Sequence, residues 1–256
     1  MLPGAEFTAT EVMADGQVGE PQVVTAVTGD GGTAVLTGLI AGKTYVLAET
    51  KAPAGYELLS DTLRFTVRTD GTIDAGWFPP AAFEVGQGGD SVAVADEPLL
   101  VSFVKQAPNG APLSGAEFTV EGPFPDGSSS KTFTSDENGT VFDKMQLVGS
   151  AEGTVYTVTE TKAPDGYLLP DGSLSLVVYD DGTVAVGDGS SSALKNAVSV
   201  SDEDGVAVVA LENEPAPGTP LPQTGDPLKL VFAVIALAAA ASLSAFSVML
   251  RRRRRQ

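Results

Sequence analysis

The sequence predicts an all-β protein with two tandem antiparallel β-sandwiches, and two observations lead to this prediction. Short runs rich in Val, Thr and Phe alternate with Gly, Asp-Gly and Asn-Gly turns, a texture typical of antiparallel sheets. The segment YVLAETKAPAGY, beginning at Tyr45, recurs as YTVTETKAPDGY at Tyr156, and Gly-Ala-Glu-Phe recurs at the same offset. A repeat this long indicates a duplicated domain, because solenoid units span only about 20–50 residues.

Each copy divides into short strands of alternating character. In the first copy we expect strands at residues 5–10, 22–27, 33–37, 45–51, 62–68 and 91–96, with a Gly/Pro-rich loop over 74–90. In the second copy we expect strands at residues 100–105, 116–121, 131–134, 140–143, 154–162, 174–179, 183–186 and 206–213. The first module would span residues 1–98 and the second residues 99–215, and residues 216–256 would form a Pro-rich spacer and a tail.

Composition excludes several classes of function. The 256 residues include no cysteine and no histidine, which excludes cysteine nucleophiles, disulfides, Cys/His zinc sites and Ser-His-Asp triads. The formal net charge of −18 disfavours nucleic acid as a partner. Asp136 and Asp202 begin segments like EF-hand loops, but no bidentate glutamate follows in place, so we expect turns there. We therefore expect neither a metal site nor a cofactor.

Three polar side chains of the second module fall on the core side of predicted strands. Alternation places Lys105, Glu160 and Asn213 there, and burial favours the neutral forms of an amine and a carboxyl group. A neutral Lys105 can attack the Asn213 amide while Glu160 shuttles protons, giving an isopeptide bond and ammonia in a single turnover. Fixed proximity supplies effective molarities of about 10⁵–10⁸ M for such a step. The alternative is a buried, hydrogen-bonded cluster that does not react.

The repeated segments resemble the E-box of Gram-positive pilins. With Gly-Ala-Glu-Phe, Phe103-Val-Lys105 and Glu212-Asn-Glu-Pro215, residues 1–215 resemble the collagen-adhesin B-type (SpaA-type pilin) domain. This resemblance implies an immunoglobulin-like β-sandwich whose first-strand lysine bonds to a last-strand Asn or Asp, with the E-box glutamate as catalyst. Those roles fall on Lys105, Asn213 and Glu160.

The first module departs from this pattern. Glu49 matches the catalyst and Asp96 the acceptor, but the lysine strand would lie before Met1. Lys51 belongs to the E-box and Lys43 to the turn before it, so neither replaces the missing lysine. We expect no internal bond here, and an exposed groove where the absent strand would pair. Because the first residues lack the features of a signal peptide, we expect the true start upstream, or a longer protein of which this is the C-terminal part.

The tail resembles a cell-wall sorting signal. Its motif is Leu221, Pro222, Gln223, Thr224 and Gly225. The hydrophobic run over residues 230–250, roughly 21 residues at about 1.5 Å each, matches the thickness of a bilayer core, and the five arginines after it should stay cytoplasmic. The resemblance implies that sortase cleaves between Thr224 and Gly225 and joins Thr224 to peptidoglycan or to another pilin subunit. The alternative is a permanent single-span membrane protein.

These features together predict a cell-wall-attached surface stalk or a minor or basal pilin-type protein that is not a turnover enzyme. The pilin motif used for shaft polymerisation is absent from these residues, which argues against a major shaft subunit unless the motif lies in upstream sequence. The alternative is an adhesin that binds a host extracellular-matrix ligand through the loop around Trp77 or through upstream sequence. A turnover enzyme is a third hypothesis, for which the sequence offers no cleft chemistry.

Overall fold

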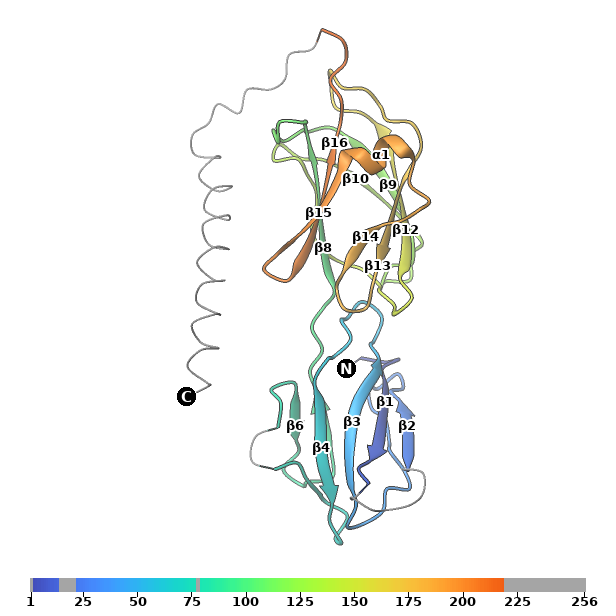
Figure 1. Cartoon of the computed structure of the whole chain (residues 1–256), viewed down its shortest axis with the longest axis vertical. Helices are drawn as coiled ribbons and strands as arrows, with labels where there is room; N and C mark the ends of the chain where they lie inside the picture. The colour runs from blue at the N-terminus through green and yellow to red at the C-terminus, as the bar shows by residue number, and fades with distance from the viewer. Residues whose placement is uncertain (1, 14–21, 77–78, 219–256) are drawn as a thin grey trace.

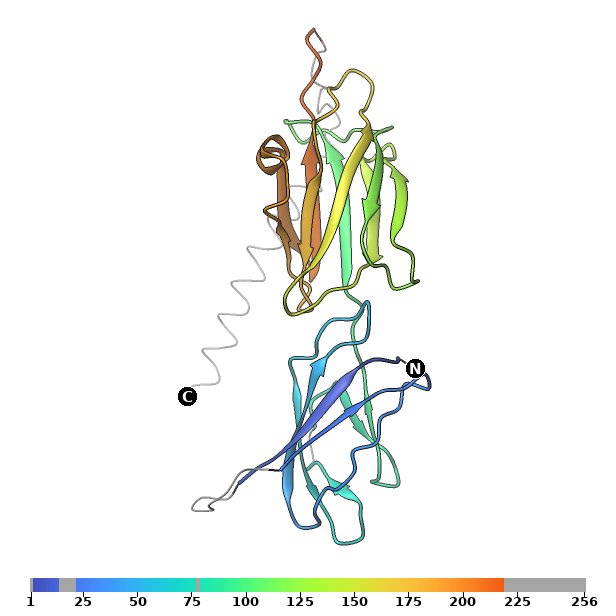
Figure 2. The ribbon, with the colours of Figure 1, turned by 90° about the vertical axis from the view of Figure 1, so that its right-hand side faces the viewer.

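The computed structural model describes residues 2–13, 22–76 and 79–218, which form two β-sandwich modules stacked along the long axis (Figure 1). We call β1 to β7 module one and β8 to β16 module two; Figure 2 shows the same stack turned by a quarter circle. Trp77, the motif at residues 221–225 and the hydrophobic run at 230–250 lie outside the described residues. Within the described ranges, no helix has the length and apolar character needed to cross a membrane. The all-β prediction is confirmed.

Module one has one complete sheet and one small sheet. Its strands are β1 (Glu6–Glu11), β2 (Val23–Val27), β3 (Thr44–Lys51), β4 (Thr62–Val67), β5 (Ile73–Asp74), β6 (Phe83–Val85) and β7 (Val92–Val94). The larger sheet has the order β2-β1-β3-β4-β5, and the smaller one contains β6 and β7. Alternation in β3 buries Tyr45, Leu47 and Glu49, so a carboxyl group shares the apolar face.

Module two has two full sheets. Its elements are β8 (Leu100–Gln106), β9 (Glu117–Glu121), β10 (Ser130–Thr134), β11 (Thr140–Gln146), β12 (Thr154–Lys162), β13 (Leu174–Val178), β14 (Val184–Val186), α1 (Ser192–Ala197), β15 (Val198–Glu203) and β16 (Val206–Glu212). One sheet has the order β10-β9-β12-β13-β14 and the other β11-β8-β16-β15. The first and last strands, β8 and β16, are parallel neighbours, so the chain enters module two at one end of this sheet and leaves it at the other end.

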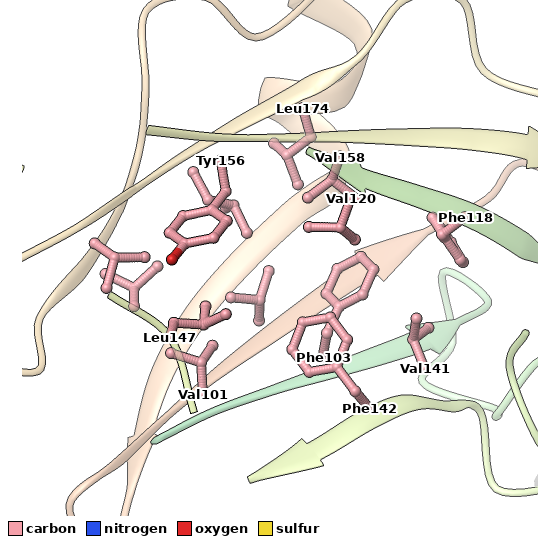
Figure 3. Close-up of a cluster of buried hydrophobic side chains, with 14 of the residues drawn as sticks. Val101, Phe103, Phe118, Val120, Val141, Phe142, Leu147, Tyr156, Val158 and Leu174 are labelled. Carbon is pink, nitrogen blue, oxygen red and sulfur yellow. The ribbon is translucent and has the colours of Figure 1, made fainter. Parts of the chain in front are cut away.

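The core of module two lies between its two sheets (Figure 3). Phe103 of one sheet meets Phe118 of the other edge to face, with ring centroids 5.3 Å apart. At the other end of the cluster, the Tyr156 hydroxyl donates to the Pro123 carbonyl oxygen at 2.6 Å and accepts from the Val148 N–H at 2.8 Å. This apolar interior continues to three buried polar side chains, Lys105, Glu160 and Asn213, and excludes water from them.

Two predictions about strands in module one need correction. No strand forms at residues 33–37, although its counterpart in module two, β11, is a strand. β11 pairs with β8, and the described part of module one has no strand in the place of β8, so residues 33–37 have no partner. The predicted loop over residues 74–90 contains β6 and the end of β5.

The two modules meet through direct hydrogen bonds to backbone carbonyl oxygens. The Leu58 N–H donates to the Asp180 carbonyl oxygen at 2.7 Å, and Gln146 Nε2 donates to the Gly55 carbonyl oxygen at 2.6 Å. A Cβ on Gly55 would lie 2.8 Å from Pro125 Cγ, so the close approach of the modules requires glycine there. Force applied along the chain therefore passes through a short, packed junction.

Candidate functional site

The two central strands of one sheet place the key side chains of module two. In β8 the inward positions are Val101, Phe103 and Lys105, all of them 0% exposed. The register of β16 sets Leu211 beside Lys105, and Asn213 follows two residues later on the same face. The opposite sheet contributes Glu160 from β12. Three strands therefore bring Lys105, Asn213 and Glu160 together, as alternation predicted.

These three side chains form one buried hydrogen-bonded cluster. Lys105 Nζ donates to Asn213 Oδ1 at 2.6 Å, and Asn213 Nδ2 donates to Glu160 Oε1 at 2.6 Å. Glu160 Oε2 lies 3.4 Å from Lys105 Nζ, an ion-pair distance without hydrogen-bond geometry. The Asn213 side chain therefore lies between the amine and one oxygen of the carboxyl group, and the other oxygen faces the amine.

Burial controls the protonation of the cluster. Glu160 is 5% exposed and Asn213 2%. Desolvation lowers the pKa of Lys105 to about 8, against the opposing effect of the nearby Glu160 carboxylate. Desolvation also raises the pKa of Glu160, against the opposing effects of Lys105 and Asn213. Both shifts favour the neutral amine and the neutral acid, the forms that acyl transfer needs.

The structure adds contacts that the sequence analysis did not identify. Lys105 Nζ also donates to the Leu211 carbonyl oxygen at 3.1 Å, which orients the amine. The Lys105 N–H donates to the Gly139 carbonyl oxygen at 2.6 Å, and Gly139 has a positive φ of 75°. A Cβ at position 139 would collide with the Lys105 carbonyl oxygen, so only glycine fits beside this backbone. Only the three-dimensional structure shows these contacts, because the β8–β16 and β8–Gly139 pairings are distant in the sequence.

Module one contains the acidic half of the same arrangement. Glu49 pairs with Phe7 as Glu160 pairs with Phe118, which makes the two glutamates structural equivalents. Asp96 and Asn213 are equivalent because each precedes a Glu-Pro segment that contacts the E-box loop. In module one the Glu57 N–H donates to the Glu97 carbonyl oxygen, and in module two the Leu168 N–H donates to the Glu214 carbonyl oxygen.

Among the described residues, no amine lies against the acidic side chains of module one as Lys105 does in module two. Glu49 is 5% exposed; its Oε2 accepts from the Leu59 N–H at 2.9 Å, but its Oε1 is buried without a partner. Asp96 Oδ1 is also buried and unpartnered. Desolvation raises the pKa of Glu49 to about 7 and also raises the pKa of Asp96.

The two lysines of module one are engaged elsewhere. Lys43 Nζ lies 2.8 Å from Glu11 Oε1, and Lys51 Nζ lies 3.4 Å from Glu6 Oε1. In the residues that the structure describes, no group of acidic side chains is arranged to hold a metal ion.

Several solved structures are similar to this chain. The C-terminal fragment of the pilus adhesin SpaC from Lactobacillus rhamnosus GG is 23% identical, with 85% of this chain and 91% of that chain covered and a TM-score of 0.45. The Bacillus anthracis TIE protein is 20% identical, with 84% and 31% covered and a TM-score of 0.39. BcpA, the major pilin subunit of Bacillus cereus, is 16% identical, with 82% and 60% covered and a TM-score of 0.31. No curated protein matches the chain.

A family model matches most of the two modules. It covers residues 1–77 and 101–192, which include the E-box glutamate of each module and the lysine strand of module two. The chain belongs to the SpaA family of prealbumin-like fold domains.

Proposed function

We propose that this chain is a cell-wall-anchored surface stalk or a minor or basal pilin-type structural protein, stapled by an isopeptide bond between Lys105 and Asn213. The observation that carries this proposal is the buried cluster in which an amine, an amide and a carboxyl group from three strands lie within hydrogen-bond or ion-pair distance. The division into residues 1–98, 99–215 and 216–256, with an immunoglobulin-like sandwich for each module, belongs to the same proposal.

Glu160 would act on both reacting nitrogens. Its Oε2 faces the Lys105 amine, and its Oε1 accepts from the Asn213 amide nitrogen. As Lys105 Nζ attacks Asn213 Cγ, Glu160 takes a proton from the attacking nitrogen and gives one to the departing nitrogen. The Cγ–Nδ2 bond breaks, ammonia leaves, and Glu160 returns to its starting form.

The Glu160 carboxyl group of module two is held by fewer hydrogen bonds from the backbone than its counterpart in module one. In module one, the Leu59 N–H holds one oxygen of Glu49. The corresponding residue in module two is Pro170, which has no N–H to donate. In the described part of the chain, neither oxygen of Glu160 accepts a backbone hydrogen bond, so both can serve the reaction.

The position of the bond suits a protein under tension. Force enters module two at β8 and leaves after β16, and these strands are parallel neighbours. A bond from Lys105 to Asn213 joins the two strands near the exit, so the load bypasses the residues between them. In a module without cysteine, the bond would also close a loop of about 100 residues, which by analogy with disulfides raises the free energy of unfolding by about 4–5 kcal/mol.

Two experiments test this function. Under denaturing conditions, the wild-type chain should have a smaller hydrodynamic size than Glu160→Gln, because the staple keeps module two looped after unfolding. Equal sizes would contradict the stapled stalk.

In a Gram-positive host with sortase, the protein should be released from cells by muramidase but not by detergent, and Thr224→Ala should reverse this behaviour. Release of the wild type by detergent would support a permanent membrane protein instead.

A further inference from the structure

β2 is an edge strand of the larger sheet of module one. In the order β2-β1-β3-β4-β5 it pairs with β1 on one side, and no strand of the described residues lies on its other side (Figure 1). β10 has the same edge position in the sheet β10-β9-β12-β13-β14 of module two. The free edge is therefore a regular feature of both modules, and what differs between them is the residues that line it.

Three residues of β2 direct their backbone groups toward the free edge. The Thr28 N–H, just after β2, donates to the Ala5 carbonyl oxygen at 2.9 Å. Hydrogen-bonded pairs alternate along an antiparallel ladder, so every second residue before Thr28 also exchanges hydrogen bonds with β1. The residues between them have N–H and C=O groups that point away from β1 and pair with no described strand: Val23, Thr25 and Val27.

The side chains at these positions make the edge of β2 apolar. Val23 is 57% exposed and Val27 is 54% exposed, and Thr25 between them is exposed as well. Edge strands are usually protected from pairing with other chains by charged side chains, prolines or bulges. β2, with the sequence VVTAV and an unbroken register with β1, has none of these protections within its bounds.

Module two has a polar edge at the same place. β2 and β10 correspond because Ala26 faces Phe7 as Phe133 faces the equivalent Phe118. β10 also carries a charge, Lys131. The same fold therefore forms without exposed valines at this edge, and the valines of β2 are not needed to build the sheet. Position by position, Val23, Thr25 and Val27 of β2 correspond to Ser130, Thr132 and Thr134 of β10.

The free edge of β2 is complementary to itself. When a second copy approaches antiparallel with Thr25 facing Thr25, Val23 of each copy faces Val27 of the other. The free N–H and C=O groups of these residues then lie in hydrogen-bonded pairs, so the positive end of each backbone dipole meets a negative end. The valines of the two copies form cross-strand pairs, an arrangement that suits β-branched side chains.

The charge of the chain also favours contact at this strand. Each copy has a formal net charge of −18, so most of its surface repels a second copy, whereas β2 carries no charged side chain. We propose that β2 pairs antiparallel with β2 of a second copy of this chain, with Thr25 on the two-fold axis, so that the larger sheets of the two copies join into one continuous sheet. This pairing does not depend on a bond between Lys105 and Asn213.

Cross-linking of the full chain in detergent tests the pairing, because the chain contains no cysteine of its own. A short bismaleimide should join two copies of Thr25→Cys, since directly opposed, hydrogen-bonded residues have Cα atoms about 5.5 Å apart. The matched control is Thr132→Cys, which places an exposed cysteine at the corresponding position of β10 and should give no cross-linked dimer.

The contribution of the valines is tested by giving β2 the residues of β10. Val23→Ser together with Val27→Thr, introduced into Thr25→Cys, should slow cross-linking about tenfold because both cross-strand valine pairs are lost. Circular dichroism checks that this variant is folded. In the wild-type chain, amide hydrogen exchange over residues 23–27 should slow as the protein concentration rises, because pairing protects the free N–H groups.

Three results would overturn the inference. The first is the absence of a cross-linked dimer of Thr25→Cys. The second is equal cross-linking of Thr25→Cys and Thr132→Cys, which would place the contact elsewhere, for example at the hydrophobic run over residues 230–250. The third is cross-linking that the valine substitutions leave unchanged, or hydrogen exchange over residues 23–27 that is independent of protein concentration, since either would show that β2 does not form the contact.

Discussion

Pulling the chain from its two ends should extend module two very little in the wild type and fully in Glu160→Gln. Lys105 and Asn213 are 108 positions apart in the sequence. At about 3.3–3.6 Å per residue, release of that segment adds up to roughly 360–390 Å of contour length. With the bond in place, only the residues before Lys105 and after Asn213 lie on the force path, and they contribute on the order of tens of Å. Glutamine keeps the size of the side chain and removes its ability to exchange protons.

Single-molecule force spectroscopy measures this difference directly. Module one, for which we expect no internal bond, should give the same unfolding step in both proteins and thus serves as an internal reference. Asn213→Ala should behave like Glu160→Gln because it removes the acceptor. A full-length step from module two in the wild-type protein would refute the reasoning, as would the absence of that step in both variants.

Three further predictions concern the cores and the site. The pKa of about 7 for folded Glu49 lies above its ordinary value of 4.5, so the folded state binds this proton more tightly, and module one should lose roughly 1–3 kcal/mol of stability as pH rises from about 4.5 to 7. Urea unfolding followed by circular dichroism at each pH should show this loss, and Glu49→Gln should remove it. Tyr156→Phe removes hydrogen bonds to two backbone groups in partly buried surroundings and should cost about 0.5–1.5 kcal/mol, measured by thermal unfolding; an unchanged midpoint would contradict those hydrogen bonds. Gly139→Ala should displace the backbone at Lys105 and reduce the bonded fraction seen by mass spectrometry, whereas Gly110→Ala, where a Cβ meets no atom, should leave it unchanged.

Alternation along the strands was enough to predict most of the fold and the meeting of the three side chains. β12 and β16 have a strong period of two, and the apolar residues of β8 alternate up to Lys105, so the inward positions of Lys105 and Glu160 could be assigned without a structure. The repeat then identified Glu49 as the counterpart of Glu160. These inferences depend only on the alternation of inward and outward residues along a strand, which is clear where one face of the strand is buried.

The remaining features depend on partners distant in the sequence. β15 is mostly exposed, so its residues show no alternation that would distinguish a strand from a loop. Residues 33–37 have the composition of a strand but no neighbour to pair with. The close approach of Gly139 to Lys105 joins a turn to a strand more than thirty residues earlier, a contact that no local pattern encodes. Whether these segments form strands or close contacts therefore depends on partners that the local sequence does not identify.

The intact mass of the full chain tests the central claim most directly. The wild-type protein should be lighter than its sequence mass by one ammonia, and a tryptic digest should contain one branched peptide joining Lys105 to Asn213. Lys105→Arg and Asn213→Ala should each restore the full mass calculated for their own sequences. A wild-type chain at its full sequence mass, with Lys105 and Asn213 in separate peptides, would show that the buried cluster does not react and would contradict the account.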